Sequence, residues 1–270
     1  MKREIIKDLL KWKESSNRKP LIVHGARQVG KTYIIKQFGK ENYNNLIYVN
    51  FETNQEFSSQ ISEHIDAKYI INKLELFYGE KILPGKTLIF FDELQDCVNC
   101  ATSLKAFNED GRYDVICSGS LMGINYNEIE SNSVGNKEDY EMYSLDFEEF
   151  LWAKGYKSEQ IEELYEHMKT LTPLSEIELS VMFDNFKEYM IIGGMPAIVY
   201  SFITNKNYSG TLKMQKQIIQ DYEEDITKYA TGLDQGKILN VYRKIPVFLG
   251  NENKKFQISK IADGARNREY

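Results

Sequence analysis

Eight consecutive residues, 25–32 (GARQVGKT), constrain what this chain can fold into more than any other part of it. They match G-x-x-x-x-G-K-[ST], the pattern of a loop that binds phosphate between a strand and a helix. The sequence indicates both the strand before this loop and the helix after it, because residues 21–24 form a short apolar run and residues 30–40 have helical character. The loop therefore predicts a domain that mixes strands with helices.

Further strands alternate with helices in the first half of the chain. Residues 46–51, 87–92 and 113–117 indicate strands, and the run 87–92 (TLIFFD) is apolar enough to be buried on both faces. Residues 68–78 carry apolar side chains at helical spacing. This alternation predicts an α/β fold, a parallel sheet with right-handed crossovers and helices on both faces. Residues 124–141 are polar, and we expect an exposed loop or hairpin there.

The second half of the chain has a mostly helical pattern. Asp146 followed by Glu149 resembles an N-cap with a carboxylate three residues later, so we expect a helix to begin there. Further helices are predicted over residues 158–169, 177–192, 212–229 and 237–249. We therefore predict two domains, a phosphate-loop domain over 1–145 and a helical domain over 146–270.

Charge and hydropathy exclude some classes of function. A net charge of −6 argues against a chain coated with nucleic acid along its whole length. No stretch approaches the roughly 18 apolar residues that a membrane helix needs. Residues 1–13 mix charged and apolar side chains, which predicts an amphipathic helix and not a signal peptide. We therefore expect a cytoplasmic protein with no membrane partner.

The three cysteines, Cys97, Cys100 and Cys117, are too few for a disulfide framework. Cys97 and Cys100 form a lone C-x-x-C, with no second pair of ligands at zinc spacing. We interpret all three as reduced structural thiols.

The phosphate-binding loop predicts ATP and Mg²⁺ as ligands. Its two glycines allow the backbone to curl, so that successive N–H groups face one concavity at the positive end of the following helix. Lys31 is expected to reach the β- and γ-phosphates, and the Thr32 hydroxyl to bind Mg²⁺. The candidate nucleotide-binding residues are Gly25, Ala26, Arg27, Gln28, Val29, Gly30, Lys31 and Thr32.

Two acidic residues at the end of the 87–92 strand extend the predicted site. Asp92 lies where a carboxylate holds magnesium in enzymes with this loop. Glu93 follows it at the carboxyl end of the strand, where ligands bind in open α/β sheets. We therefore take Asp92 as a metal ligand beside Thr32, and Glu93 as the candidate base that polarises the attacking water.

Two further features have alternative interpretations. Residues 118–120 (SGS) follow the next strand, where a hydroxyl could lie near the γ-phosphate or simply form a turn. We include Ser120 with Lys31 and Glu93 as a candidate catalytic residue. Arg27 could contact the γ-phosphate or a neighbouring subunit, or it could pair with a nearby acidic residue. An oligomer is left open.

Six blocks of sequence are similar to blocks of one family and together span nearly the whole chain. They are HGARQVGKT (24–32), LIFFDELQ (88–95), ICSGSLMG (116–123), EMYSLDFEEFLWAKG (141–155), GGMPA (193–197) and KFQISKIADGARNREY (255–270). The chain resembles the prokaryotic AAA-like ATPases that carry a C-terminal domain of unknown function. The first two blocks occur in phosphate-loop proteins generally, and the last four are specific to this family.

The resemblance implies the same roles for Lys31, Thr32, Asp92 and Glu93. It implies a partial winged-helix segment at the C-terminus, and a family chain that continues past Tyr270, so we expect a fragment. If that segment binds DNA, the expected phosphate contacts are Lys254, Lys255, Lys260, Arg266 and Arg268.

Two functions follow as hypotheses. The first is an ATPase whose nucleotide state moves or regulates its C-terminal domain. The second is a nucleotide-gated module with little turnover, which regulates a DNA or protein partner. A kinase-like function is weaker, because the sequence has no arginine-rich lid. Measured phosphate release separates the first hypothesis from the second.

Overall fold

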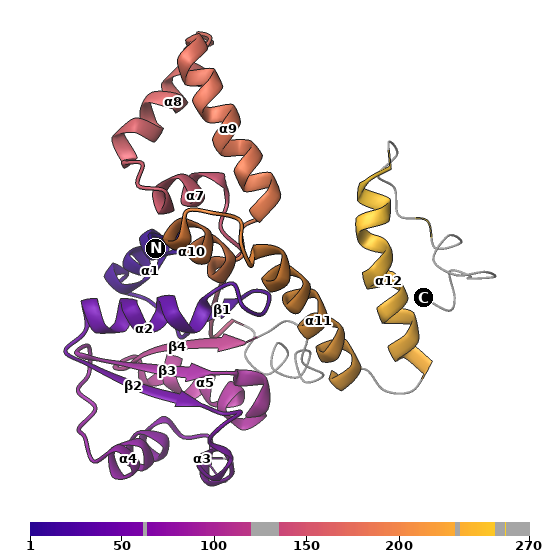
Figure 1. Ribbon diagram of the computed structural model, residues 1–270. Helices are drawn as coiled ribbons and strands as arrows, with labels where there is room; N and C mark the ends of the chain where they lie inside the picture. Colours follow the sequence, from indigo (N-terminus) through magenta and orange to yellow (C-terminus); the bar gives the residue numbers. More distant parts are fainter. Residues whose placement is uncertain (62–63, 120–134, 230–232, 252–256, 258–270) are drawn as a thin grey trace. The chain divides into compact units, whose positions relative to one another are not determined.

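The computed structural model of this chain is shown as a ribbon in Figure 1. It describes residues 1–61, 64–119, 135–229, 233–251 and 257. The chain forms two compact units, Met1–Thr211 and Leu212–Tyr270. Within the described ranges, no helix combines the length and the apolar character needed to cross a membrane.

The first unit is built on a five-stranded sheet in the order β2-β3-β4-β1-β5. Every neighbouring pair of strands is parallel. The strands are β1 (Leu21–His24), β2 (Asn45–Asn50), β3 (Thr87–Asp92), β4 (Asp114–Gly119) and β5 (Glu138–Glu141). The predicted α/β fold with a parallel sheet is confirmed.

Helices connect the strands and continue after them. Those before β5 are α1 (Ile5–Glu14), α2 (Lys31–Asn42), α3 (Gln55–Ile61), α4 (Ala67–Tyr78), the short 3₁₀ helix η1 (Leu94–Asp96) and α5 (Val98–Asp110). Those after β5 in the first unit are α7 (Phe147–Ala153), α8 (Ser158–Thr170), α9 (Glu176–Ile192) and α10 (Pro196–Asn205).

Alternating side chains of the strands bury both faces of the sheet. In β3, Leu88 and Phe90 join a core cluster with residues of α1 and α2. Ile89 and Phe91, on the other face, join a cluster with residues of α3, α4 and α5. Figure 1 shows α2 on one side of the strands and α3 and α4 on the other. The prediction of helices on both faces is confirmed, and this burial explains why the four central residues of β3 are apolar.

One strand was not predicted from the sequence. Residues 138–141 form β5, which pairs in parallel with β1 so that Leu21 lies opposite Glu138. The prediction of a loop or hairpin over 124–141 is therefore wrong for its last four residues, and 124–134 lie outside the described residues. β5 is an edge strand whose side chains are exposed or half-buried, so it needs no apolar pattern to form.

The helical character of the second half is confirmed. Asp146 caps α7 by accepting a hydrogen bond from the Glu149 N–H, and the Glu149 side chain accepts one from the Asp146 N–H. This capping box starts the helix at the predicted place. The short helix α10, which begins with Pro196, was not predicted.

The second unit contains α12 (Leu233–Leu249) and nearly all of α11 (Thr211–Tyr229). The two helices pair through Arg243 and Glu223, with 2.7 Å from Nε to Oε1, and through the stacked rings of Tyr222 and Tyr242. Helices α7 to α10 belong to the compact first unit. The functional boundary near residue 145 stays a prediction, because a division by function need not follow a division by compactness.

Candidate functional site

The phosphate-binding loop runs from the end of β1 at His24 to the start of α2 at Lys31. Its two glycines have backbone conformations that other residues rarely adopt, with φ of 149° at Gly25 and 96° at Gly30. A Cβ atom on Gly25 would lie 2.1 Å from the carbonyl oxygen of Met142. Both positions therefore need glycine, for conformation at Gly30 and also for space at Gly25.

Lys31 lies inside the loop and is only 8% exposed. Its Nζ donates hydrogen bonds to the carbonyl oxygens of Gly25 and Ala26, each at 2.8 Å. Burial lowers the pKa of Lys31, while the nearby carboxylates of Glu93 and Asp92 act in the opposite direction. The loop thus carries a buried amine that bonds to its own backbone and faces acidic neighbours.

Asp92, at the end of β3, is surrounded by three hydroxyl groups. Its Oδ2 accepts hydrogen bonds from Thr32 Oγ1 and from the Tyr48 hydroxyl, both at 3.0 Å. Its Oδ1 accepts one from Ser118 Oγ. These residues come together because parallel strands end at one edge of the sheet, where α2 begins. The structure therefore brings the two candidate metal ligands, Thr32 and Asp92, into direct contact.

Glu93 has an unusual backbone conformation for a residue with a side chain. Its φ of 56° and ψ of 52° lie in the left-handed region, which costs about 1 kcal/mol or more outside glycine. Its Oε2 accepts a hydrogen bond of 2.5 Å from Gln95 Nε2. Burial raises the pKa of Glu93, and the bond from Gln95 opposes that rise. Strain and a raised pKa at the end of this strand are features of functional carboxylates.

The remaining predicted residues are placed as follows. Ser118 is buried against Asp92, and Ser120 lies outside the described residues. Arg27 is half-buried, and its charge lowers the pKa of both Lys31 and Glu93. Arg27 is therefore close to an acidic side chain and to the phosphate-binding loop, and both of its interpretations stay open.

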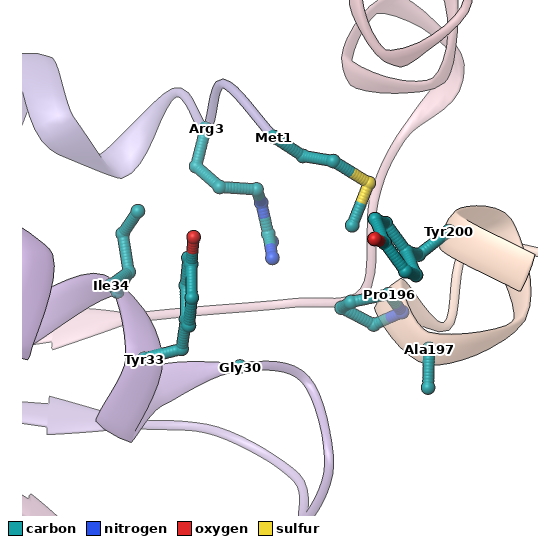
Figure 2. Close-up of a pocket in the computed structure, with 8 residues that line it drawn as sticks. All are labelled: Met1, Arg3, Gly30, Tyr33, Ile34, Pro196, Ala197 and Tyr200. Atoms are coloured by element: carbon teal, nitrogen blue, oxygen red, sulfur yellow. The ribbon is translucent and has the colours of Figure 1, made fainter. Parts of the chain in front are cut away.

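A cavity of about 450 Å³ adjoins the loop at Gly30. Figure 2 shows Tyr33 of α2 and Tyr200 of α10 on opposite sides of it, with Arg3 extending between them. The lining residues are Met1, Arg3, Gly30, Tyr33, Ile34, Pro196, Ala197 and Tyr200. The cavity is thus mainly apolar and aromatic, and it opens beside the phosphate-binding loop.

Two of the family-specific blocks meet behind the loop. After β5, the Met142 N–H donates to the His24 carbonyl at 2.8 Å, and the Leu145 N–H donates to the Gly194 carbonyl at 2.7 Å. Pro196 then lies beside the loop, with its Cγ 3.7 Å from where a Cβ of Gly30 would be. The blocks EMYSLDFEEFLWAKG and GGMPA are therefore the supports of the phosphate-binding loop.

Replacing Gly194 with alanine should destabilise this support. A Cβ atom there would lie 2.0 Å from the Leu145 carbonyl oxygen, and 3.0 Å from the Leu145 carbonyl carbon and nitrogen. Because backbone must move to relieve that clash, we expect a loss of about 3 kcal/mol, or roughly 10 °C in melting temperature. Thermal unfolding followed by circular dichroism measures it.

A matched control is Gly236→Ala in α12, where a Cβ would meet no atom within 4 Å. That change should leave the melting temperature equal or higher, because alanine favours a helix over glycine. Equal stability of the two variants would contradict the close packing of Gly194 on Leu145.

Three functional candidates could not be predicted from the sequence. Tyr48 contacts Asp92, Gln95 contacts Glu93, and Arg3 reaches the loop from the N-terminal segment. Only Gln95 lay inside a recognised block, LIFFDELQ, and it carried no signal of its own. Tyr48 is interior to a strand and Arg3 to an amphipathic segment, where either residue is ordinary.

The three cysteines form no further site within the part of the chain that the structure describes. Cys97, Cys100 and Cys117 are buried, and burial raises the pKa of the Cys100 and Cys117 thiols. Among the described residues, no group of three or more His, Cys, Asp or Glu side chains could hold a metal ion. Lys254, Lys255, Lys260, Arg266 and Arg268 lie outside the described residues.

Comparison with solved structures finds loose likenesses to a DnaA protein and an ORC1 protein. The AMPPCP-bound DnaA of Aquifex aeolicus is 14% identical, with a TM-score of 0.43, over 97% of this chain and 81% of that one. The ORC1 protein of Aeropyrum pernix in complex with DNA is 10% identical, with a TM-score of 0.42, over 95% and 79%. At these values the likeness carries no argument about function.

Two further comparisons concern the sequence. An uncharacterized protein of Methanocaldococcus jannaschii, MJ1544, is 26% identical over 82% of this chain. The chain spans 43% of that relative's length. Residues 183–270 match a domain of unknown function (DUF8612), and residues 17–151 match the model of an AAA domain. The match to the AAA-domain model covers half of the chain, and the chain therefore belongs to the AAA-domain family.

Proposed function

We propose that this chain binds ATP with Mg²⁺ and hydrolyses it to ADP and phosphate. The observation that carries the proposal is the meeting of Thr32, Asp92 and Glu93 beside the loop that holds Lys31. A hydroxyl and a carboxylate in contact are oxygen ligands of the kind that Mg²⁺ takes in nucleotide sites. The AAA family supports nucleotide binding, and hydrolysis is our inference from these side chains.

The phosphates would occupy the concave side of the loop. Their charge is met by backbone N–H groups, by the N-terminus of α2 and by Lys31. Lys31 Nζ must then exchange the carbonyl oxygens of Gly25 and Ala26 for phosphate oxygens. Thr32 and Asp92 would hold the Mg²⁺ ion, which supplies further neutralisation of the phosphate charge.

The adenine base would enter the cavity beside Gly30. Base pockets are typically apolar clefts of this size, and aromatic rings stack on bases. Tyr33 and Tyr200 supply such rings, and they are 67% and 62% exposed. The cavity opens at the first turn of α2, so one nucleotide could place its base in the cavity and its phosphates in the loop.

Glu93 would act as the general base. Its carboxylate takes a proton from a water molecule as the water oxygen attacks the γ-phosphorus. The bond from the γ-phosphorus to the oxygen that bridges the β- and γ-phosphates breaks, and ADP leaves. A raised pKa makes the carboxylate a better proton acceptor. Gln95, bonded to Oε2, holds the side chain in one orientation.

A second candidate function is a nucleotide-gated module with little turnover. The hydrogen bonds of the two carboxylates favour this function, because they would compete with water and metal. Glu93 already accepts a bond from Gln95, and Asp92 accepts bonds from three hydroxyl groups. In both candidates the nucleotide state moves or regulates the C-terminal region, where we propose a DNA or protein partner.

The test is ATP binding and turnover by the chain itself. Calorimetric titration with ATP in the presence of Mg²⁺ should show saturable, magnesium-dependent binding, and phosphate release should follow. Binding with no phosphate release above background would favour the gated module. No binding at all would remove the basis of both candidates.

The base cavity can be tested with Tyr200→Ala. We expect about tenfold weaker ATP binding, which corresponds to about 1.4 kcal/mol, because stacking of a base on an aromatic side chain contributes about 1–3 kcal/mol. Binding of inorganic triphosphate should not change, because that ligand has no base. Tyr165→Ala, on the surface of α8 at 39% exposure, is the control. An equal loss for both ligands would place the base elsewhere.

A further inference from the structure

Arg3 joins three segments that are far apart in the sequence. Its Nη1 donates to the Val29 carbonyl at 2.9 Å, within the phosphate-binding loop. Its Nη2 donates to the Tyr143 carbonyl at 2.6 Å, and its Nε donates to Glu149 Oε1 at 3.0 Å. Arg3 is 7% exposed, so this is a buried guanidinium in which each of the three nitrogen atoms donates a hydrogen bond.

Glu149 fixes the other end of this connection to helix α7. Its Oε1 also accepts from the Glu4 N–H at 2.7 Å, and its Oε2 accepts from the Asp146 N–H at 3.3 Å. Its own N–H donates to Asp146 Oδ1 at 2.8 Å. Because the carboxylate that binds Arg3 also accepts a hydrogen bond from the N–H of the N-cap residue Asp146, we expect a shift of Arg3 to disturb the first turn of α7.

Phosphate binding would change the contacts inside the phosphate-binding loop, where Arg3 bonds to the Val29 carbonyl. Lys31 now bonds to the carbonyls of Gly25 and Ala26, three to four residues before the carbonyl that Arg3 holds. Arg3 also lines the cavity beside Gly30, with Nη1 3.8 Å from where a Cβ of that glycine would lie. Figure 2 shows the guanidinium pointing toward Gly30. Both parts of a nucleotide would therefore lie against Arg3 or its partner carbonyl.

We propose that Arg3 is a positioning residue that couples occupancy of the phosphate-binding loop to helix α7. The proposal rests on the proposed function, because it takes ATP as the ligand of the loop. Coupling of this kind needs a continuous set of contacts that responds at both ends. Here that set is Val29, Arg3, Glu149 and the N-terminus of α7.

The chain carries a natural reporter at the far end. Of its two tryptophans, Trp152 is in the last turn of α7, and the Lys2 ammonium lies 4.0 Å from the centre of its ring. Trp12 is buried in the core on α1. A change between α7 and the N-terminal segment should alter the distance from Lys2 to Trp152 and hence the tryptophan emission.

The experiment compares ATP binding with tryptophan emission in the same samples. ATP with Mg²⁺ should change the emission of the wild-type chain, and Trp152→Phe should abolish that change without abolishing binding. In the charge-balanced variant Arg3→Met/Glu149→Gln, we expect ATP binding within about tenfold of wild type and an emission change at least fivefold smaller. The matched control is Arg112→Met/Asp110→Asn. It removes another arginine–carboxylate ion pair, which lies before β4 and whose arginine is exposed.

The full emission change in the Arg3→Met/Glu149→Gln variant would overturn the proposal. So would wild-type chain that binds ATP with no change from Trp152. If that double variant does not fold, Arg3→Lys decides, because lysine keeps a charge near Glu149 but cannot bond two carbonyls and a carboxylate in the same planar array. An undiminished change in Arg3→Lys would also overturn it. Failure of wild type to bind ATP is a different result, since it removes the proposed function itself.

Discussion

ATP affinity is expected to fall about 100-fold when Lys31 is replaced with alanine, because hydrogen bonds from an ammonium to phosphate contribute about 3 kcal/mol. Lys31 is buried inside the phosphate-binding loop, and its Nζ already bonds to the carbonyl oxygens of Gly25 and Ala26. Alanine offers neither the charge nor the reach. Calorimetric titration with ATP and Mg²⁺ measures the loss directly.

The control for this variant is Lys40→Ala, which removes an exposed lysine from the last turn of the same helix. It should leave ATP affinity unchanged, and circular dichroism should show that both variants are folded. If Lys31→Ala bound ATP as tightly as wild type, the loop would not be the nucleotide site, and the remaining assignments would fall with it.

Turnover is expected to fall by about 100-fold or more in Glu93→Gln, the range that a positioned general base contributes. Glutamine has the shape of glutamate and can still accept a hydrogen bond from Gln95, but it cannot take a proton from water. ATP affinity should therefore stay within a few-fold of wild type. Single-turnover phosphate release, measured on enzyme saturated with ATP, separates the two effects.

Glu109→Gln is the control for turnover, since it removes an exposed carboxylate from α5. It should hydrolyse ATP at the wild-type rate. A Glu93→Gln variant that keeps full turnover would mean that another group activates the water. If neither wild type nor Glu93→Gln released phosphate while both bound ATP, the gated module would be the better description.

The parts of the fold that the sequence predicted are those defined by local pattern. Strands β1 and β3 begin and end at the predicted residues, because each carries a continuous apolar run and is buried along its whole length. The loop between β1 and α2 was visible from two glycines at fixed spacing. Family membership and the parallel sheet followed from the same short segments.

The missed elements have no local pattern. β5 is a polar edge strand that forms only because β1 offers it an unpaired backbone, 114 residues or more earlier in the chain. Arg3 and Glu149, 146 residues apart, contact each other only after the sheet and α7 are assembled. Tyr48 became a neighbour of Asp92 through the order of the strands, which one sequence does not reveal. The roles of Thr32 and Asp92 as metal ligands and of Glu93 as the base stay predictions that the geometry supports.

The supports of the phosphate-binding loop come from both sides of the segment by which the family is recognised. Arg3 precedes residue 17 and Pro196 follows residue 151, yet each lies against the loop. An excised piece limited to that segment would leave the Val29 carbonyl without its guanidinium and open one wall of the cavity. A piece of the chain that keeps the loop in this shape must therefore be longer than the segment that matches the family model, and exchanging that segment between relatives would separate the loop from the residues that hold it in place.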